Sequence, residues 1–267
     1  ESPATQLAIS TLKQWSNITM LDCAQGELAC GTSGKGRMQE IDTILAAAEY
    51  ELTPKTLKNK HILITAGPTQ EAIDPVRYIS NASTGKMGYA IAEELAVRGA
   101  KVTLISGRTT LPVPKGVERV DVLSAEDMYR AATAAWQEAD GGVMCAAVAD
   151  YTPVVVADKK LKKSDDDMRI ELKRTKDIAK ELGASKGGRI LVGFALETDN
   201  EEANAQGKLV RKNLDFVVLN SLRDAGAGFR GNTNKITIID HNGAEEHPLM
   251  SKREAAAVIV DKIETLK

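Results

Sequence analysis

From His61 onward, short runs of apolar and β-branched residues alternate with longer amphipathic segments. The apolar runs are bounded by Gly, Pro, Asn or charged residues, which is typical of buried strands. We predict strands at 61–66, 101–106, 117–122, 142–149, 189–196 and 216–220. Helices are predicted near 84–98, 125–139, 176–183, 201–213 and 252–266. This alternation predicts an α/β fold with a Rossmann-like, doubly wound, mainly parallel sheet covered on both faces.

Several predicted helices begin with capping residues. The candidates are the capping boxes Thr198 with Glu201 and Ser251 with Glu254, the weaker box Ser124 with Asp127, and Thr175 as an N-cap. Near the end of the chain, 235–240 alternates like an antiparallel strand, and Asn242-Gly243 supplies its turn. We therefore expect a small antiparallel C-terminal addition to the sheet.

The first 50 residues have a different pattern. We predict a helix at 3–15 and a short strand at 18–21, whereas 26–38 is too rich in Gly to form a packed element. Leu52-Thr53-Pro54-Lys55 is a plausible boundary. The sequence thus predicts two domains, at 1–52 and 53–267.

Composition excludes several classes of protein. The 267 residues are 43% apolar, and a net charge of −2 argues against a general nucleic-acid binder. The chain has no run of 18 apolar residues, so we expect no membrane span, and its N-terminus lacks the features of a signal peptide. Three cysteines are too few for a disulfide scaffold and have no metal-binding spacing. We expect a cytoplasmic protein.

The loop Gly67-Pro68-Thr69-Gln70-Glu71 follows a predicted buried strand, at the edge where open α/β sheets bind ligands. It is not a GxGxxG fingerprint. Gly85-Lys86 is not a Walker A loop either, because Ser80 stands at the first glycine position and Met87 replaces the Ser or Thr. Both a plain strand–helix turn and a ligand-binding loop fit these residues.

Arg77 and Asn81 flank a second loop. An arginine can hold a carboxylate or phosphate in a bidentate manner, and an asparagine offers both a donor and an acceptor. A loop salt bridge and a turn residue would also explain them. From the residues alone, the structural interpretation is favoured.

Two lysine-rich segments also allow two interpretations. The run 158–163 carries four lysines and follows the small-residue run Ala146–Tyr151, which contains Asp150. It is either a solvated loop or a mobile lid that brings cations over a triphosphate. Lys208 and Lys212 are four residues apart on a predicted helix and share one face, which is either solvated or a binding face.

Taken together, these motifs resemble the phosphopantothenoylcysteine synthetase domain of the bacterial bifunctional coenzyme A biosynthesis flavoprotein. The resemblance is carried by PVRYISNASTGKMG at 75–88, AAVADY at 146–151 with its lysine run, and GFALET at 193–198 with the lysine helix. It implies CTP-dependent ligation of 4′-phosphopantothenate with L-cysteine through an acyl-cytidylate, with Mg²⁺. It also implies a homodimer whose sites lie near the subunit interface.

The resemblance assigns roles to individual residues. Asn81 would hold the phosphopantothenoyl group and the acyl intermediate, and Lys160 would stabilise charge in the transition state. Arg77 would be a further catalytic residue. The implied nucleotide-binding set is Met144, Cys145, Ala146, Asp150, Lys160, Thr175, Lys176, Asp177, Ile178, Phe194, Lys208 and Lys212. The metal ligands stay unassigned.

The segment ELACGTSGKGRM at 27–38 resembles the substrate-clamp loop of phosphopantothenoylcysteine decarboxylase, the partner activity of the same bifunctional protein. There, Cys30 would be the proton donor, although only in a longer form of the protein. The FMN-binding body of that decarboxylase does not precede it in this sequence, so we expect no decarboxylation by this chain and assign 1–52 to the end of that domain.

Three alternatives stay open. One is an NAD(P)-binding reductase of the same fold class, which the missing glycine fingerprint disfavours. Another is a non-catalytic module that assembles with a flavoprotein decarboxylase. The third is an ATP-using synthetase, because the sequence does not settle the choice of base.

Overall fold

The computed structural model describes residues 2–163, 167–197, 200–221 and 231–266. The chain divides into two compact units, Glu1–Pro54 and Lys55–Lys267. The division falls within the 52–55 segment that the sequence marks as a boundary. Each unit is described by itself.

The first unit contains two helices and a hairpin. Helix α1 is Pro3–Lys13, strands β1 (Ala24–Glu27) and β2 (Ser33–Arg37) pair antiparallel, and α2 is Ile41–Leu52. The segment 26–38, which was not expected to form a packed element, lies in this hairpin, and none of its residues is buried. Backbone hydrogen bonds hold the hairpin, and glycine makes them as other residues do. The expected strand at 18–21 is absent, and α2 was not predicted. Ala47 is the only buried residue among those described in this unit, so its core is minimal.

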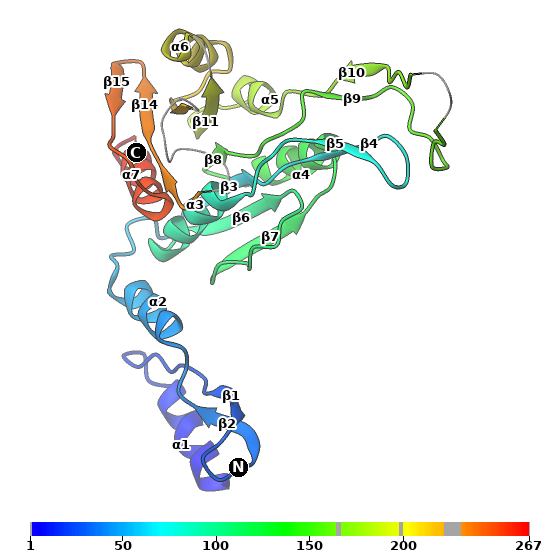
Figure 1. Cartoon of the computed structure of the whole chain (residues 1–267). Coiled ribbons are helices and arrows are strands. Elements are labelled where there is room, and N and C mark those ends of the chain that lie inside the picture. The colour runs from blue at the N-terminus through cyan, green and yellow to red at the C-terminus, as the bar shows by residue number, and fades with distance from the viewer. Residues whose placement is uncertain (1, 164–166, 198–199, 222–230, 267) are drawn as a thin grey trace. The chain divides into compact units, whose positions relative to one another are not determined.

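The second unit is built on an eight-stranded sheet with the order β15-β14-β12-β11-β8-β3-β6-β7 (Figure 1). The parallel strands are β3 (His61–Ala66), β6 (Lys101–Ser106), β7 (Val117–Asp121), β8 (Gly141–Met144), β11 (Ile190–Glu197) and β12 (Phe216–Ser221). Strands β14 (Ile236–Asp240) and β15 (Gly243–Glu246) extend it antiparallel. The predicted α/β class and the antiparallel C-terminal addition are confirmed.

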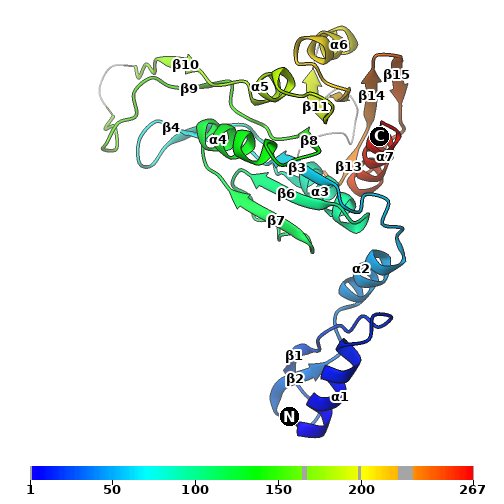
Figure 2. The same cartoon turned by 180° about the vertical axis from the view of Figure 1, so that it is seen from behind.

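Helices cover both faces of this sheet (Figures 1 and 2). Helices α3 (Lys86–Val97) and α7 (Lys252–Thr265) pack on one face, against residues such as Ile62 and Ile64 of β3. Helices α4 (Ala125–Trp136), α5 (Ile178–Ala184) and α6 (Glu201–Arg211) pack on the other, against Leu63. Because successive strand side chains point to opposite faces, one apolar strand supplies both layers of the core.

Two of the predicted capping boxes are present in the structure. Ser124 with Asp127 and Ser251 with Glu254 form complete capping boxes. Helix α5 is instead capped by Asp177, whose carboxylate accepts from Lys180 N, so Thr175 is not the N-cap. Helix α6 begins after Asn200, and the predicted partner Thr198 lies outside the described residues.

The strand predicted at 142–149 ends at Met144. Beyond it the chain stays beside the end of β3 without forming a regular ladder. Ala147 N donates to Gly67 O at 3.0 Å, and Pro68 and Ala147 form an isolated bridge. Small apolar residues thus continue a strand-like pattern into what is a loop at the carboxyl edge of the sheet.

Two hairpins form an arm that extends from this edge (Figure 2). One pairs β4 (Gln70–Ala72) with β5 (Tyr78–Ser80), and the other pairs β9 (Tyr151–Pro153) with β10 (Leu172–Arg174). Ala157 N donates to Ile73 O at 3.0 Å, which joins the two hairpins. The sequence did not predict them, because strands of three residues carry too little periodicity.

The remaining pair is β13 (Thr233–Asn234) with β16 (Met250–Ser251), which lies just before α7. Within the described part of the chain, no helix combines the length and apolarity that crossing a bilayer would require.

Candidate active site

Two adjoining cavities open at the carboxyl ends of the parallel strands. The chain leaves β3 toward one side of the sheet and β8 toward the other, so their junction is a topological switch point, where open α/β sheets bind ligands. The first cavity has a volume of about 560 Å³ and the second about 390 Å³. Both are lined by Ala146, Val148, Asp150, Phe194 and Lys208. Two ligands bound there would meet at this shared wall.

The first cavity gathers most of the predicted nucleotide-binding set. The members that line it are Met144, Ala146, Asp150, Thr175, Lys176, Asp177, Ile178, Phe194, Lys208 and Lys212. Cys145 lines the second cavity instead, because successive residues beyond β8 face opposite ways. Lys160 lines neither cavity. Segments from β8, the start of α5, β11 and α6 therefore converge on the first cavity.

Positive charge dominates the first cavity. Its lining includes five cationic side chains, Arg174, Lys176, Lys180, Lys208 and Lys212, against the carboxylates of Asp150 and Asp177. Lys212 Nζ lies 2.8 Å from Asp177 Oδ2, and Lys208 Nζ donates to Phe194 O. Burial opposes ionisation of Asp177, but the bonds from Lys212 and Lys180 N outweigh it and lower its pKa. Such a cavity suits a polyanion.

Thr175 does not cap a helix but positions the start of α5, which the capping prediction did not anticipate. Its hydroxyl donates to Ala149 O at 2.7 Å, and its backbone N–H donates to Asp150 O at 3.0 Å. These bonds fasten the entrance of α5 to the loop beyond β8. The opposite walls of the first cavity are therefore held at a fixed separation.

Asn81 lies at the second cavity with its amide fixed. Its Nδ2 donates to Ala147 O and to Val148 O, each at 3.1 Å. Cys145 lines the same cavity, and burial raises the pKa of its thiol to about 12. The thiol is therefore neutral at physiological pH, and the Asn81 amide is held beside the loop that both cavities share.

The Gly67–Glu71 loop is hydrogen-bonded to segments that form the cavity walls. Thr69 is fully buried, and its hydroxyl accepts from Ala149 N at 2.9 Å while Ser80 Oγ donates to Thr69 O. Buried Glu71 accepts from Ala125 N at 2.8 Å, at the start of α4. Gly67 has a φ of 74°, and a Cβ there would lie 2.9 Å from Gly107 O. This loop therefore holds the strand ends rather than lining either cavity.

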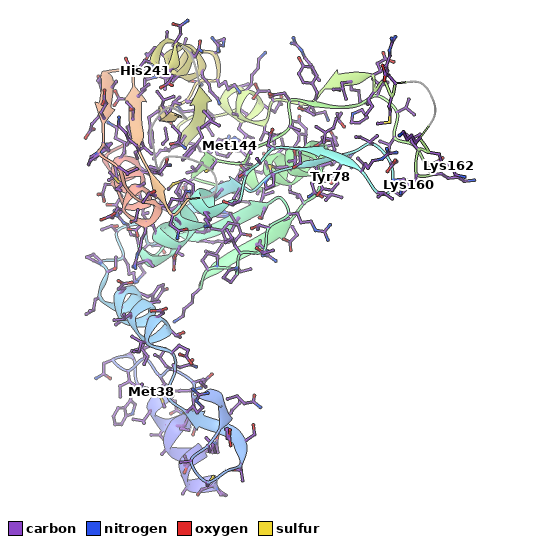
Figure 3. All side chains as sticks on the ribbon, viewed as in Figure 1. Met38, Tyr78, Met144, Lys160, Lys162 and His241 are labelled. Carbon is purple, nitrogen blue, oxygen red and sulfur yellow. The ribbon has the colours of Figure 1, made fainter. Side chains whose placement is uncertain are left out.

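Arg77 and Lys160 lie on the arm, and neither lines the first or the second cavity. Figure 3 shows Lys160 at the far end of the arm, away from Met144 at the carboxyl end of β8. Arg77 is anchored there because its guanidinium binds Asp74 Oδ2 and Leu161 O, the latter at 2.7 Å. The same ion pair holds the pKa of the buried Asp74 carboxyl far below its usual range. The expected lid continues through 164–166, which lie outside the described residues.

Lysines 86 and 252 are cavity residues that the sequence analysis did not single out. Both line the second cavity, together with Asn220 and Asn234. Lys86 stands inside the 75–88 motif and could have been noticed there. Lys252 reads as an ordinary first-turn helix residue, so no sequence pattern indicates that it is 7% exposed and faces a cavity.

Cys30 lies in the first unit, exposed, with its Sγ 3.1 Å from Thr32 Oγ1. Hydrogen bonding to Thr32 lowers its thiol pKa. Within the described ranges, no three His, Cys, Asp or Glu side chains are grouped closely enough to hold a metal ion.

Comparison with known proteins agrees with this architecture. A model of the family described as "DNA/pantothenate metabolism flavoprotein C-terminal domain" matches residues 57–266. A prokaryotic "Cysteine/Cysteine sulfinic acid decarboxylase" is 48% identical over 99% of this chain, which covers 76% of that protein. The "Coenzyme A biosynthesis bifunctional protein CoaBC" of Bacillus subtilis is 47% identical over the whole chain, which spans 66% of that protein's length.

A crystal structure of the C-terminal domain of a coenzyme A biosynthesis bifunctional protein CoaBC superposes with a TM-score of 0.68 at 43% identity. The match covers 79% of this chain and 97% of that structure. Sequence and structure agree over the unit that carries both cavities. The chain belongs to the family of DNA/pantothenate metabolism flavoprotein C-terminal domains.

Proposed function

We propose that this chain catalyses the CTP-dependent ligation of 4′-phosphopantothenate with L-cysteine. The observation that carries the proposal is the pair of cavities sharing one wall. One is rich in cations and suits a nucleoside triphosphate, while the other presents Asn81. The similarity to CoaBC proteins, whose name places them in coenzyme A biosynthesis, supports the same reaction.

In the first step, a carboxylate oxygen of phosphopantothenate attacks the α-phosphorus of CTP. The bond from that phosphorus to the bridging oxygen breaks, and pyrophosphate leaves. Lys176, Lys208 and Lys212 neutralise the triphosphate, whose Mg²⁺ accompanies it as part of the substrate. The shared wall places the carboxylate beside the α-phosphate, which lowers the entropic part of the barrier.

In the second step, the cysteine amine attacks the acyl carbon of the acyl-cytidylate. The C–O bond to CMP breaks, the amide forms, and the amine proton is released. Asn81, fixed by the carbonyls of residues 147 and 148, orients the acyl group. No side chain needs to act as a nucleophile, so the reaction proceeds without a covalent enzyme intermediate.

The proposal includes a homodimer in which the arm reaches a partner's cavity. Arg77 is anchored to Asp74 on the arm and so does not reach the cavities of its own chain. The arm also exposes apolar side chains, including Val76, Tyr78, Val155 and Leu161. A second copy that covers them would supply Arg77 to the neighbouring site and exclude water from the acyl intermediate.

The test is pyrophosphate release with CTP, Mg²⁺, 4′-phosphopantothenate and L-cysteine, each omitted in turn, and with ATP in place of CTP. We expect release to require CTP and phosphopantothenate, and CMP to appear only after cysteine is added. Equal rates with ATP would overturn the choice of base. No release by the folded protein would favour the non-catalytic assembly module, and a cofactor fluorescence titration with NAD(P)H would test the reductase.

A further inference from the structure

Asp74 lies in the turn between β4 and β5, and the proposed reaction gives its carboxylate no role. The side chain is fully buried, with an exposed fraction of 0%. Its Oδ1 accepts from Val76 N and from Arg77 N, each at 2.8 Å. Its Oδ2 accepts from Arg77 Nε at 2.9 Å, from Arg77 Nη2 at 2.5 Å and from Leu161 N at 3.1 Å. Both oxygens are therefore satisfied, as a buried charge requires.

Leu161 is the point at which the lysine-rich run is fastened to the β4–β5 turn. Its N–H donates to Asp74 Oδ2, and its carbonyl accepts from Arg77 Nη2 at 2.7 Å. One ion pair thus holds both backbone polar groups of this residue. Shortly before it in the chain, Ala157 N donates to Ile73 O at 3.0 Å. The stretch between these two contacts is therefore attached to the turn at both of its ends.

Lys160 directly precedes Leu161, so the bonds to Leu161 fix the backbone from which the Lys160 side chain extends. That side chain is exposed at the far end of the arm (Figure 3). Arg77 also keeps 38% of its side chain exposed, and its bonds to Asp74 and Leu161 use Nε and Nη2. Arg77 can therefore hold Leu161 and contact a ligand at the same time.

The negative charge of Asp74 is essential to this attachment. The bonds from Arg77 hold the pKa of the carboxyl far below its usual range, so it stays ionised throughout the neutral range. An asparagine has nearly the same shape, but its amide nitrogen donates hydrogen bonds and accepts none. In place of Oδ2, that nitrogen would face the donors of Arg77 and Leu161. In place of Oδ1, it would face two backbone N–H groups. Asp74→Asn therefore breaks part of the attachment without creating a cavity.

We infer that Asp74 is a positioning residue for Lys160, because its ion pair with Arg77 fixes Leu161 and thereby the backbone of the lysine. The catalytic part of the inference rests on the proposed function and on the transition-state role that the family resemblance gives to Lys160. The attachment itself is a property of the fold. Asp74 and Leu161 are 87 residues apart, so no local sequence pattern indicates their contact.

The experiment compares Asp74→Asn with Asp240→Asn. Asp240 is a matched control, because it also accepts from the backbone N–H groups two and three residues ahead and pairs with a cation, Lys262, at 2.7 Å. It lines neither cavity and lies on β14, outside the arm. We expect Asp74→Asn to lower kcat for pyrophosphate release about 10- to 100-fold with the KM for CTP unchanged. Asp240→Asn should change neither, and an equal fall in both variants would contradict the inference.

A double-mutant cycle tests whether Asp74 acts through Lys160. Single-turnover pyrophosphate release is measured for Asp74→Asn, for Lys160→Gln and for the two combined. If the carboxylate serves to place the lysine, removing it costs little once the lysine is gone, so the combined loss should fall well short of the product of the two single losses. Losses that multiply in full would show that Asp74 supports the protein by another route.

Tryptic cleavage without substrates tests the attachment independently of activity. Lys162 and Lys163 follow Leu161 and are exposed. Trypsin cleaves after lysine and needs a locally mobile backbone. We expect cleavage after these two lysines, followed by peptide mass spectrometry, to become several-fold faster in Asp74→Asn and to stay unchanged in Asp240→Asn.

The two readouts separate this inference from the proposed function. An inactive wild-type protein in which Asp74→Asn still speeds cleavage would refute the ligase and support the attachment of Leu161. An active wild type in which Asp74→Asn changes neither cleavage nor pyrophosphate release would overturn the inference alone. Should Asp74→Asn fail to fold, Leu161→Pro decides by the same two measurements, because it removes the N–H that donates to Asp74.

Discussion

The three cysteines differ in exposure and in what surrounds each thiol. Cys145 is half-buried, and desolvation raises the pKa of its thiol to about 12, whereas the Thr32 hydroxyl lowers the pKa of exposed Cys30. Because the thiolate is the reactive form, a thiol with a raised pKa gains reactivity only as the pH approaches that value. We predict that iodoacetamide at neutral pH modifies Cys30 first and leaves Cys145 intact.

Peptide mass spectrometry over time gives the three modification rates, with exposed Cys23 as the internal reference. Thr32→Val should bring the rate of Cys30 down toward that of Cys23, because it removes the hydroxyl that stabilises the thiolate. Modification of Cys145 in the folded protein as fast as Cys23 would show that its burial is wrongly assigned.

The role proposed for Lys160 would require motion of the arm or a partner chain. It is exposed on the arm, outside both cavities. We predict that Lys160→Gln leaves the melting temperature unchanged and nearly abolishes pyrophosphate release, because a cation over the triphosphate acts mainly in the transition state. The neighbouring Lys162→Gln is the matched control. Unchanged single-turnover release in Lys160→Gln would remove the residue from the mechanism.

At the scale of elements, the long apolar strands were predictable and the short ones were not. Strand β3 was predicted with its observed bounds, since a six-residue run that is mostly apolar and buried on both faces leaves a clear pattern. The hairpins of the arm and of the first unit were not predicted, because their strands are short, polar or Gly-rich. The first cavity followed from motifs at strand ends, whereas Lys252 depended on tertiary packing that periodicity does not encode.

The packing of α3 on β3 depends on a helix position without a side chain. A Cβ on Gly88 would lie 2.6 Å from the Cβ of Ala66, in the fully buried layer beneath the cavities. Gly88→Ala should therefore force the helix outward and destabilise the unit by about 1–3 kcal/mol, despite the better helix propensity of alanine. Urea unfolding of this variant measures the loss.

Gly188→Ala is the control for that substitution, because a Cβ at Gly188 meets nothing within 4 Å. It should leave the free energy of unfolding nearly unchanged. If both substitutions had the same small effect, α3 would have enough freedom to accommodate the methyl group. The close approach at Ala66 would then not determine where Gly85 and Lys86 sit.

At the scale of the whole molecule, the proposed function treats the cavities and the arm as separate parts of one site. Both cavities are lined by residues of the Lys55–Lys267 unit, whereas Arg77 and Lys160 line neither of them, and Figure 3 shows Lys160 at the far end of the arm. An arm that served its own chain would have to break the bonds from Arg77 to Asp74 and Leu161. An arm that serves a partner can keep them, and the exposed apolar residues of the arm are then buried by association.

Complementation tests this arrangement. Asn81→Asp loses the amide donor to the carbonyls of residues 147 and 148, so we expect it to impair the second step more than the first. Arg77→Gln should disable the group supplied by the arm. If Arg77 acts in the partner's site, mixing the two inactive variants forms heterodimers in which one site has both native residues, and roughly a quarter of the wild-type activity should return, because half the dimers are mixed. Wild-type protein mixed with either variant sets the scale. A mixture that stays inactive after subunit exchange, verified by mass spectrometry, would place Arg77 and Asn81 in the same chain's site and require the arm to fold back.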